Sequence, residues 1–187
     1  MTVLPAGTEV PYTVTWLEMT ACPTYDWPHL PVGPPATLLH ATKPPRWYFL
    51  ALYDAVGRDY AWEDAHKDDP AKLQAWLDDA KHLYTLMRDG IPQGFFLLHE
   101  ETTTDTDLTY FGLVPDAVGR GLGTFLLRTA ILTAWSREGV RRLTVNTCTL
   151  DHPRALAHYQ KNGFKPVRRE SFTRTLTRPH DPARIPD

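Results

Sequence analysis

Gly119, Gly121 and Gly123 occur at alternate positions between a short apolar run and a long amphipathic one. Glycine has no side chain to cover its backbone N–H group, and the first turn of a helix adds free N–H donors at the positive end of the helix dipole. Such groups together bind phosphate. The spacing predicts a site for a phosphate or pyrophosphate, with a simple strand-to-helix turn as the plainer alternative.

The residues on either side predict how this loop is held. Residues 107–114 read as a strand that ends at Pro115, which has no N–H to donate. From Gly119 onward the apolar residues recur at helical spacing, which predicts a long helix with one buried face. The glycines are therefore expected at a strand-to-helix junction.

Hydrophobic periodicity and breakers predict the other elements. The expected strands are residues 9–19, 81–88, 93–101, 107–114, 141–147, 164–167 and 170–176. The expected helices are residues 46–56, 70–80, the one that begins at 119, and 153–162. Short turns make the three consecutive strands antiparallel, whereas the strand–helix–strand crossing that ends near Thr147 should be parallel.

Turn residues and prolines predict the connections. Asp89–Gly90 favours a tight hairpin, and Gly57 is expected to end a helix in the left-handed conformation. Residues 22–45 contain seven prolines and are expected to form an irregular loop, either a functional cover or a disordered segment. The tail 179–187 is expected to be flexible.

Length and composition indicate one domain over residues 1–187, with 42% hydrophobic and 22% charged residues. The formal net charge of -2 gives no reason to expect nucleic acid or an anionic membrane as a partner. Cys22 and Cys148 provide neither a disulfide framework nor metal spacing. With no signal-peptide pattern and no apolar run of about 20 residues, a cytoplasmic location is expected.

Two motifs in this order resemble the GNAT superfamily of N-acetyltransferases. The family's Q/R-x-x-G-x-G/A loop is matched by residues 118–123 (VGRGLG), and its A-x-x-x-Y-x-x-x-G-F ending by residues 155–164 (ALAHYQKNGF). The resemblance is strongest over residues 107–164 and topological only over residues 9–101. It implies an α/β (α+β) fold: a mixed, mostly antiparallel, twisted sheet that splits between strands 4 and 5, flanked by about four helices.

The resemblance implies that acetyl-CoA is the co-substrate, without a metal, and that its pyrophosphate lies on residues 119–124. Two departures concern this site. Val118 stands where the family has Gln or Arg, and Asp151 stands where many members have an Asn that contacts the pantetheine arm. Arg120 could replace the first contact, and His152 or Asn146 the second. The implied cofactor-binding residues are Leu113, Val114, Val118, Gly119, Arg120, Gly121, Leu122, Gly123, Thr124, Asn146 and His152.

The same comparison implies that Tyr159 is the general acid that reprotonates the CoA thiolate, with a packed aromatic residue as the alternative. A backbone N–H near Val114 is expected to hold the oxyanion. Asp107 is the candidate base, because some members carry a glutamate on this strand. Alternation places Asp107 on one strand face and both Leu108 and Tyr110 on the other. The alternatives are a water chain or Glu63, Asp64, Glu100, Glu101 and Tyr110.

The remaining chemistry-bearing residues have plain interpretations. His66, His82, His99 and His158 lack metal spacing and are expected to be exposed or hydrogen-bonded, and Cys148 is expected to be a small residue near the cofactor. The acceptor is expected between the two early helices, the proline-rich loop and the hairpin. Six aromatic residues lie in or near these segments, most of them expected in the core: Trp27, Trp47, Tyr48, Tyr53, Trp62 and Trp76.

The sequence thus predicts an acetyl-CoA-dependent N-acetyltransferase that acts on a primary amine of a small molecule or peptide. The alternatives are a non-catalytic module that binds or senses acyl-CoA, and a longer acyl donor. The acceptor, the general base and the role of the proline-rich loop stay open. A homodimer through the closing strands is a further expectation from the resemblance.

Overall fold

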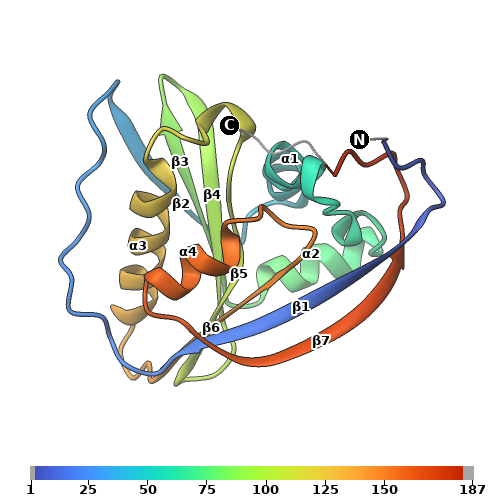
Figure 1. Ribbon diagram of the computed structural model, residues 1–187. Coiled ribbons are helices and arrows are strands. Elements are labelled where there is room, and N and C mark those ends of the chain that lie inside the picture. The colour runs from blue at the N-terminus through green and yellow to red at the C-terminus, as the bar shows by residue number, and fades with distance from the viewer. Residues whose placement is uncertain (1–2, 183–187) are drawn as a thin grey trace.

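The computed structural model describes residues 3–182, which form a seven-stranded sheet with helices on both faces (Figure 1). The strands are β1 (Glu9–Met19), β2 (Ala36–Thr42), β3 (Lys81–Arg88), β4 (Ile91–Glu100), β5 (Asp105–Leu113), β6 (Arg142–Cys148) and β7 (Lys165–Thr175). The helices are α1 (Arg46–Gly57), α2 (Pro70–Asp78), α3 (Leu122–Trp135) and α4 (Ala155–Lys161), with short 3₁₀ turns at Arg58–Tyr60, Asp64–His66 and Pro115–Ala117.

The sheet order is β2-β3-β4-β5-β6-β1-β7, and all neighbouring strands are antiparallel except β5 and β6. The parallel pair is short. Residues Asp105–Asp107 of β5 pair with Arg142–Thr144 of β6, and beyond them the two strands separate. The predicted fold class and the predicted split are therefore confirmed, because residues 107–114 and 141–147 were expected as the fourth and fifth strands.

Helices on opposite faces divide the core. Along β4, Phe96 packs with the apolar side of α3, whereas Phe95 on the opposite face packs with α1 and α2. Both rings are fully buried. Burying such a side chain is worth about 1.5–3 kcal/mol, so the alternation fixes which helix covers which face. The longest helix, α3, has 14 residues, and no helix within residues 3–182 is long and apolar enough to span a membrane.

Local sequence explains where α2 begins and how β3 turns into β4. The Asp69 carboxylate accepts hydrogen bonds from the N–H groups of Ala71 and Lys72, and Pro70 occupies the first position of α2. Asp89 and Gly90 both have positive φ, 51° and 75°, as a tight hairpin turn between β3 and β4 requires.

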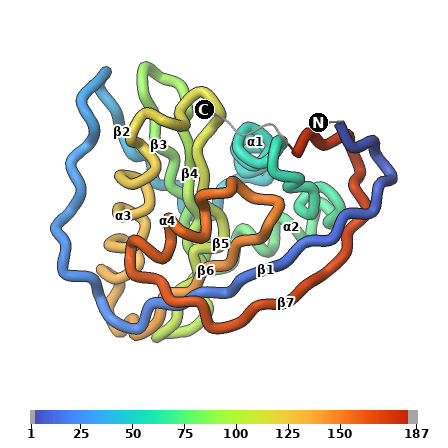
Figure 2. Tube along the Cα trace, in the orientation of Figure 1, coloured from blue at the N-terminus to red at the C-terminus, as the bar shows by residue number. Residues whose placement is uncertain are grey.

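The irregular-loop prediction for residues 22–45 is wrong in part, because β2 lies within it and pairs with β3. Prolines flank residues 36–42 but do not interrupt them. The N–H groups of residues 36–42 are therefore available to the sheet. Figure 2 shows the rest of this segment along the outside of α3. There Tyr25 and Leu30 pack against the core on the α3 face, so the loop covers a helix and not the acceptor region.

The two closing strands expected at 164–167 and 170–176 are one continuous strand, β7, with a register shift opposite Trp16 and Leu17 of β1. The expected flexibility of the tail 179–187 stays a prediction. His180 exchanges backbone hydrogen bonds of 2.9 and 2.8 Å with Leu4. Residues 183–187 lie outside the described residues.

Gly57 has φ −90°, so the expected left-handed cap is wrong. Its Cβ would lie 2.4 Å from Trp62, so glycine is needed here for space. The expected face assignment on β5 is wrong as well. Leu97 pairs with Tyr110 and Leu98 with Leu108, which leaves Thr109 as a bulge. Leu108 therefore packs toward α3 and Tyr110 toward α1.

Candidate functional site

A cavity of about 550 Å³ lies where β5 and β6 separate, with residues of both strands in its wall. Its wall has two distinct ends. The glycine end consists of Val118, Gly119, Gly121, Gly123, Thr124 and His158. The aromatic end consists of Tyr12, Tyr53, Tyr60, Trp62 and Tyr110, together with Asp64 and Arg174. Between them lie Asn146, Cys148, Asp151, His152 and Tyr159.

The glycine end is built from backbone. Gly119 and Gly121 have φ of 79° and 76°, conformations that other residues adopt only with strain. Gly121 directly precedes α3, and no side chain caps the first turn of that helix. The first N–H groups of α3 are thus left without a side-chain acceptor, at the positive end of the helix dipole. This arrangement favours an anionic ligand.

Gly123 needs another explanation, since it lies within α3. A Cβ at this position would meet Leu113 at 3.7 Å and the Nε2 atom of His158 at 4.0 Å, which are ordinary contacts. Alanine would therefore fit and would favour the helix by roughly 0.5–1 kcal/mol. Packing does not require glycine here. What glycine provides is open space in the cavity wall.

The edge of β5 forms one side of the cavity. Beyond Asp107 its residues have no partner on β6, so backbone groups on that side can pair with an extended ligand as with an added strand. The hydroxyl of Thr109, the bulge residue, is enclosed and has no hydrogen-bond partner. The N–H of Val114 donates to the carbonyl of Gln93 at 3.0 Å. Val114 itself therefore does not supply the oxyanion donor expected nearby.

Tyr159 extends from α4 into the wall between the two ends and is 6% exposed. Its ring packs edge-on against Phe111 and Phe164. Burial, reinforced by the charges of Asp151 and Asp107, raises the pKa of Tyr159 far above its usual value. The phenol is therefore neutral and keeps a proton to donate inside the cavity.

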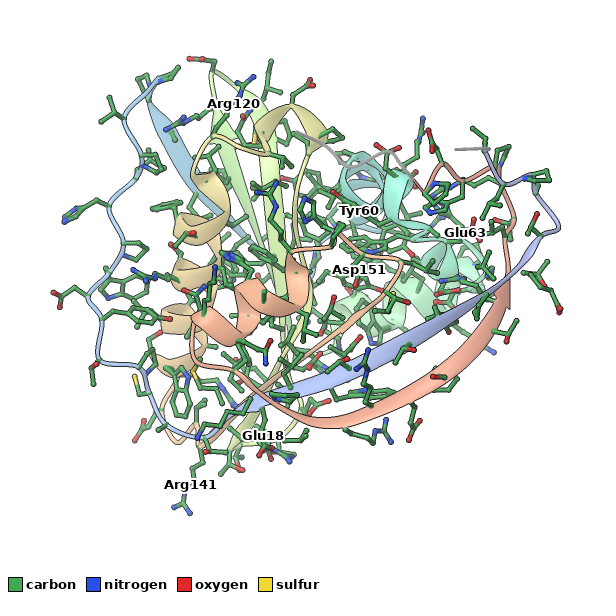
Figure 3. All side chains as sticks on the ribbon, viewed as in Figure 1. Glu18, Tyr60, Glu63, Arg120, Arg141 and Asp151 are labelled. Carbon is green, nitrogen blue, oxygen red and sulfur yellow. The ribbon has the colours of Figure 1, made fainter. Side chains whose placement is uncertain are left out.

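The carboxylate of Asp151 has hydrogen-bond partners on both of its oxygens. It accepts hydrogen bonds from the Thr147 hydroxyl at 2.7 Å, the Cys148 N–H at 2.8 Å and the Trp62 indole N–H at 3.1 Å. These bonds tie the β6–α4 connection to the segment after α1. Figure 3 shows Tyr60 and Asp151 close together at the centre of the molecule. Asp151 therefore holds the cavity wall in place.

Two histidines face the cavity with unused nitrogens. The Nε2 atoms of His152 and His158 are enclosed and have no hydrogen-bond partner. Burial lowers the pKa of both, as do nearby cations, with Arg154 next to His152 and Lys161 and Arg128 near His158. Nδ1 of His152 accepts the N–H of Arg154, so its proton is assigned to Nε2. Both rings are neutral at pH 7 and available to a ligand.

The cavity brings together most of the residues predicted from the sequence. Those in its wall are Leu113, Val118, Gly119, Gly121, Gly123, Thr124, Asn146, His152 and Tyr159. Val114, Arg120, Leu122 and Asp107 are not in it. The Leu122 side chain is fully buried in the core, and Arg120 lies at the surface near the start of α3 (Figure 3). Asp107 accepts a hydrogen bond from Thr144 at 2.6 Å at the base of the split.

Some of the other candidate bases lie in the cavity wall and others lie outside it. Asp64 and Tyr110 are in the cavity wall. Glu63 is 3% exposed and accepts the Thr177 N–H, beside Arg178 at 3.9 Å. Glu100 contacts His82 and Arg137 on the α3 face of the sheet. Neither Glu63, Glu100 nor Glu101 lines this cavity.

The aromatic end differs from the expected acceptor region. No residue of the proline-rich loop or of the β3–β4 hairpin lines the cavity, whose wall here comes from β1, β5, β7, α1 and the turn after α1. Of the aromatic residues singled out in the sequence, Tyr53 and Trp62 are in this wall. Trp27 and Trp47 are 55% and 70% exposed, whereas Tyr48 and Trp76 pack against the core.

Cys148 is half-buried in the wall, and burial raises the pKa of its thiol to about 11. It is therefore a protonated thiol at pH 7, which agrees with a small packing residue better than with a nucleophile. Among the described residues, no group of three or more His, Cys, Asp or Glu side chains could hold a metal ion.

His158 and Arg174 are among the residues of this wall that sequence reasoning missed. His158 was expected to be exposed or hydrogen-bonded; its Nε2 atom is enclosed without a partner, while a backbone hydrogen bond with Gly123 acts on the ring. Its position directly before Tyr159 in a short helix was the available signal, because neighbouring residues on such a helix can both reach a facing cavity. Arg174 had no comparable signal, since the strand β7 that carries it was predicted in two pieces.

The sequence pattern of the Acetyltransferase (GNAT) family matches residues 49–164, which is more than half of the chain. No protein of curated function matches the sequence.

Solved structures share the fold at low identity. A tandem GNAT protein from the clavulanic acid biosynthesis pathway is 17% identical, with a TM-score of 0.60 over 92% of this chain and 55% of that one. A GCN5-related N-acetyltransferase from Sphaerobacter thermophilus is 19% identical, with a TM-score of 0.59 over 96% and 54%. The chain thus spans about half the length of these two proteins.

A GNAT family acetyltransferase from Elizabethkingia anophelis with acetyl-CoA bound is 19% identical, with a TM-score of 0.52 over 71% of this chain and 78% of that one. Together with the family match over residues 49–164, these likenesses lead to one conclusion: this chain belongs to the GNAT family of acetyltransferases.

Proposed function

We propose that this protein transfers an acetyl group from acetyl-CoA directly to the primary amine of an acceptor. The observation that carries the proposal is the single cavity with a phosphate-binding type of loop at one end, aromatic side chains at the other, and the Tyr159 phenol between them. The structure of the relative from Elizabethkingia anophelis is described with acetyl-CoA bound, which supports the same donor here.

In this proposal the pyrophosphate binds the backbone of residues 119–124, and the pantetheine arm pairs with the free edge of β5. His158 at the glycine end and His152 farther along present Nε2 atoms that have no hydrogen-bond partner among the described residues. The missing polar side chain at Val118 weakens the donor site without abolishing it, because backbone groups provide most of its donors.

The transfer needs a neutral amine, which attacks the thioester carbonyl. A C–N bond forms, the tetrahedral intermediate collapses, and the C–S bond breaks. The departing thiolate takes the Tyr159 proton, and the phenolate is reprotonated by the proton that the amine loses. Asp107, the candidate base, lies outside the cavity wall, and its carboxylate accepts a hydrogen bond from the Thr144 hydroxyl at 2.6 Å. It would therefore act through water.

The test is release of the CoA thiol from acetyl-CoA in the presence of a panel of primary amines, with the acetylated product identified by mass. Tyr159→Phe should lower kcat about 10²–10⁴-fold and leave acetyl-CoA affinity unchanged. Tyr84→Phe is the matched control, since Tyr84 stacks on Phe96 outside this cavity. Acetyl-CoA binding without turnover over a broad panel would instead favour the non-catalytic acyl-CoA-binding module.

A further inference from the structure

Arg174 extends from β7 into the aromatic end of the cavity. Its side chain is only 15% exposed. The Nη2 atom donates to the Asp64 carboxylate at 2.8 Å, and the guanidinium lies 5.8 Å from the centre of the Tyr12 ring. The Nε atom is enclosed and has no partner. Among the described residues, Nη2 is the only nitrogen of Arg174 with a hydrogen bond, although a guanidinium carries five N–H donors.

Asp64 does not neutralise this cation fully. Its side chain is 71% exposed and is shared with Lys67, whose Nζ atom lies 3.1 Å away. Exposed carboxylates of this kind are hydrated and screened, so their ion pairs are weak. The positive charge of Arg174 also lowers the pKa of Tyr53 and of Cys148 somewhat, against larger effects of burial. Its field thus extends over the cavity wall.

Among the described residues, Asp64 is the carboxylate in contact with Arg174, whereas Asp151, the other anion of the wall, is already hydrogen-bonded to Thr147, Cys148 and Trp62. Burial raises the pKa of Tyr53 and Tyr60 to about 12, so both phenols are neutral at pH 7. The Trp62 ring lies 5.3 Å from Tyr53 and 5.5 Å from Tyr110, which makes this wall a set of closely packed rings. A guanidinium that is poorly hydrated and has unused donors favours a planar anion in contact with it.

We propose that the acceptor is an amine that also carries a carboxylate, and that Arg174 binds this carboxylate in the aromatic end. This inference rests on the proposed acetyl transfer. With the carboxylate on Arg174, the rest of an amino-acid-like acceptor lies along Tyr53, Tyr60 and Trp62, and its amine faces the middle of the cavity, where Tyr159 lies. Arg174 carries one positive charge, and its Nη2 atom is already bonded to Asp64. This charge matches the single negative charge of a carboxylate better than the two charges of a phosphate.

The first experiment compares matched amines: L-phenylalanine, its amide, and 2-phenylethylamine, each by initial rate of CoA release. The carboxylate-bearing amine should have the higher kcat/KM by about 10- to 100-fold, the effect of hydrogen bonds to a charged group. Arg174→Gln should remove this preference by raising KM, with kcat and the rates for the other two amines nearly unchanged. Equal kcat/KM for the three amines would overturn the inference, as would an equal loss for all three in Arg174→Gln.

Arg168→Gln is the matched control. Arg168 lies on the same strand, contacts the Trp16 ring at 3.7 Å, is 54% exposed and does not line the cavity. Arg168→Gln should leave the preference for the carboxylate-bearing amine unchanged. Asp64→Asn, a second variant, removes the competing anion and should strengthen the preference.

Equilibrium binding separates this inference from the proposed function. L-phenylalanine is titrated into wild-type protein and Arg174→Gln, with tryptophan fluorescence as the signal. Weaker binding in the variant, even without turnover by either protein, supports the carboxylate site while the transferase proposal fails. Turnover of uncharged amines together with equal L-phenylalanine binding in both proteins leaves the transferase proposal standing and rejects the carboxylate site.

Discussion

The two ends of the cavity are built from different parts of the polypeptide. The glycine end uses backbone groups of residues 118–124, held by the strand-to-helix junction before α3. The aromatic end uses side chains from β1, β5, β7, α1 and the turn after α1, which are far apart in the sequence. A backbone site tolerates few changes because it depends on φ and on the absence of Cβ atoms. A site made of side chains can change its ligand by single substitutions.

The largest effect is expected from Gly121→Val. A β-branched residue at φ 76° is strained, and its side chain would stand in the cavity wall. Acetyl-CoA affinity, measured by calorimetry, should fall by about 100-fold or more, roughly 3 kcal/mol. Gly7→Val is the control. It has φ 87°, open space within 4 Å and no place in the wall, so it should lower stability without changing affinity.

Trp62→Phe tests whether the aromatic end can be altered alone. The substitution removes the indole N–H that donates to Asp151, a bond of 3.1 Å, and leaves that carboxylate oxygen without its donor. The free energy of unfolding should fall by about 1–3 kcal/mol and KM for the acceptor should rise, with acetyl-CoA affinity unchanged. Trp47→Phe, at a site 70% exposed, should change neither quantity. A loss of acetyl-CoA affinity in Trp62→Phe would show that the two ends are coupled.

Gly123→Ala should move stability and donor binding in opposite directions. The Cβ fits beside Leu113 and His158, so the helix should gain about 0.5–1 kcal/mol in unfolding free energy. The same methyl group occupies the cavity wall, so acetyl-CoA affinity should fall about tenfold. Thermal melts and calorimetry measure the two quantities. A stabilised variant with unchanged affinity would mean that the donor does not pass this residue.

The same contrast explains how much of the site could be predicted from the sequence. The glycine end was predicted because its residues are contiguous and because glycine signals a backbone requirement by its type alone. Tyr159 was predicted through the motif that ends in Gly163–Phe164. Arg174 was missed, since its place in the wall depends on the long β7 lying beside β1 in one register. No local pattern encodes that register.

The fold class, the four helices and the split were predicted, but three local expectations failed for physical reasons. β2 was not predicted because prolines flank it, although its pairing with β3 needs only residues 36–42. The bulge at Thr109 reversed the face of Tyr110, because one extra residue inverts a period of two. At Gly57 the limiting factor is the Trp62 side chain, not handedness, and a tertiary contact of that kind has no sequence signature.

A smaller effect on stability is expected from a change of pH, and it concerns His158 at the glycine end. Burial lowers the pKa of His152 and His158 in the cavity, and of His40 and His99 elsewhere. The unfolded chain, with histidine pKa values near about 6.5, then binds protons first as the pH falls. Their contribution to stability is present above that pH and is lost as the pH falls through the folded pKa values.

The melting temperature should therefore fall between pH 7 and pH 5. His158→Gln should reduce that fall, whereas His29→Gln, at an exposed position in the proline-rich loop, should not. Acetyl-CoA should also protect the wild type more strongly at pH 5.5 than at pH 7, because a nearby pyrophosphate favours the protonated imidazole of His158. Equal protection at both pH values would place His158 away from the phosphates.

The smallest effect is expected from Lys67→Gln at the rim of the aromatic end. Lys67 and Asp64 are 49% and 71% exposed, so their ion pair should contribute less than about 1 kcal/mol to stability. Without Lys67, the Asp64 carboxylate pairs with Arg174 alone, and their 2.8 Å contact becomes tighter. Fewer N–H donors of Arg174 are then available to a carboxylate ligand. KM for carboxylate-bearing amines should rise slightly, with acetyl-CoA affinity constant. A fall in KM would instead mean that Lys67 competes with the acceptor amine for the same carboxylate of Asp64.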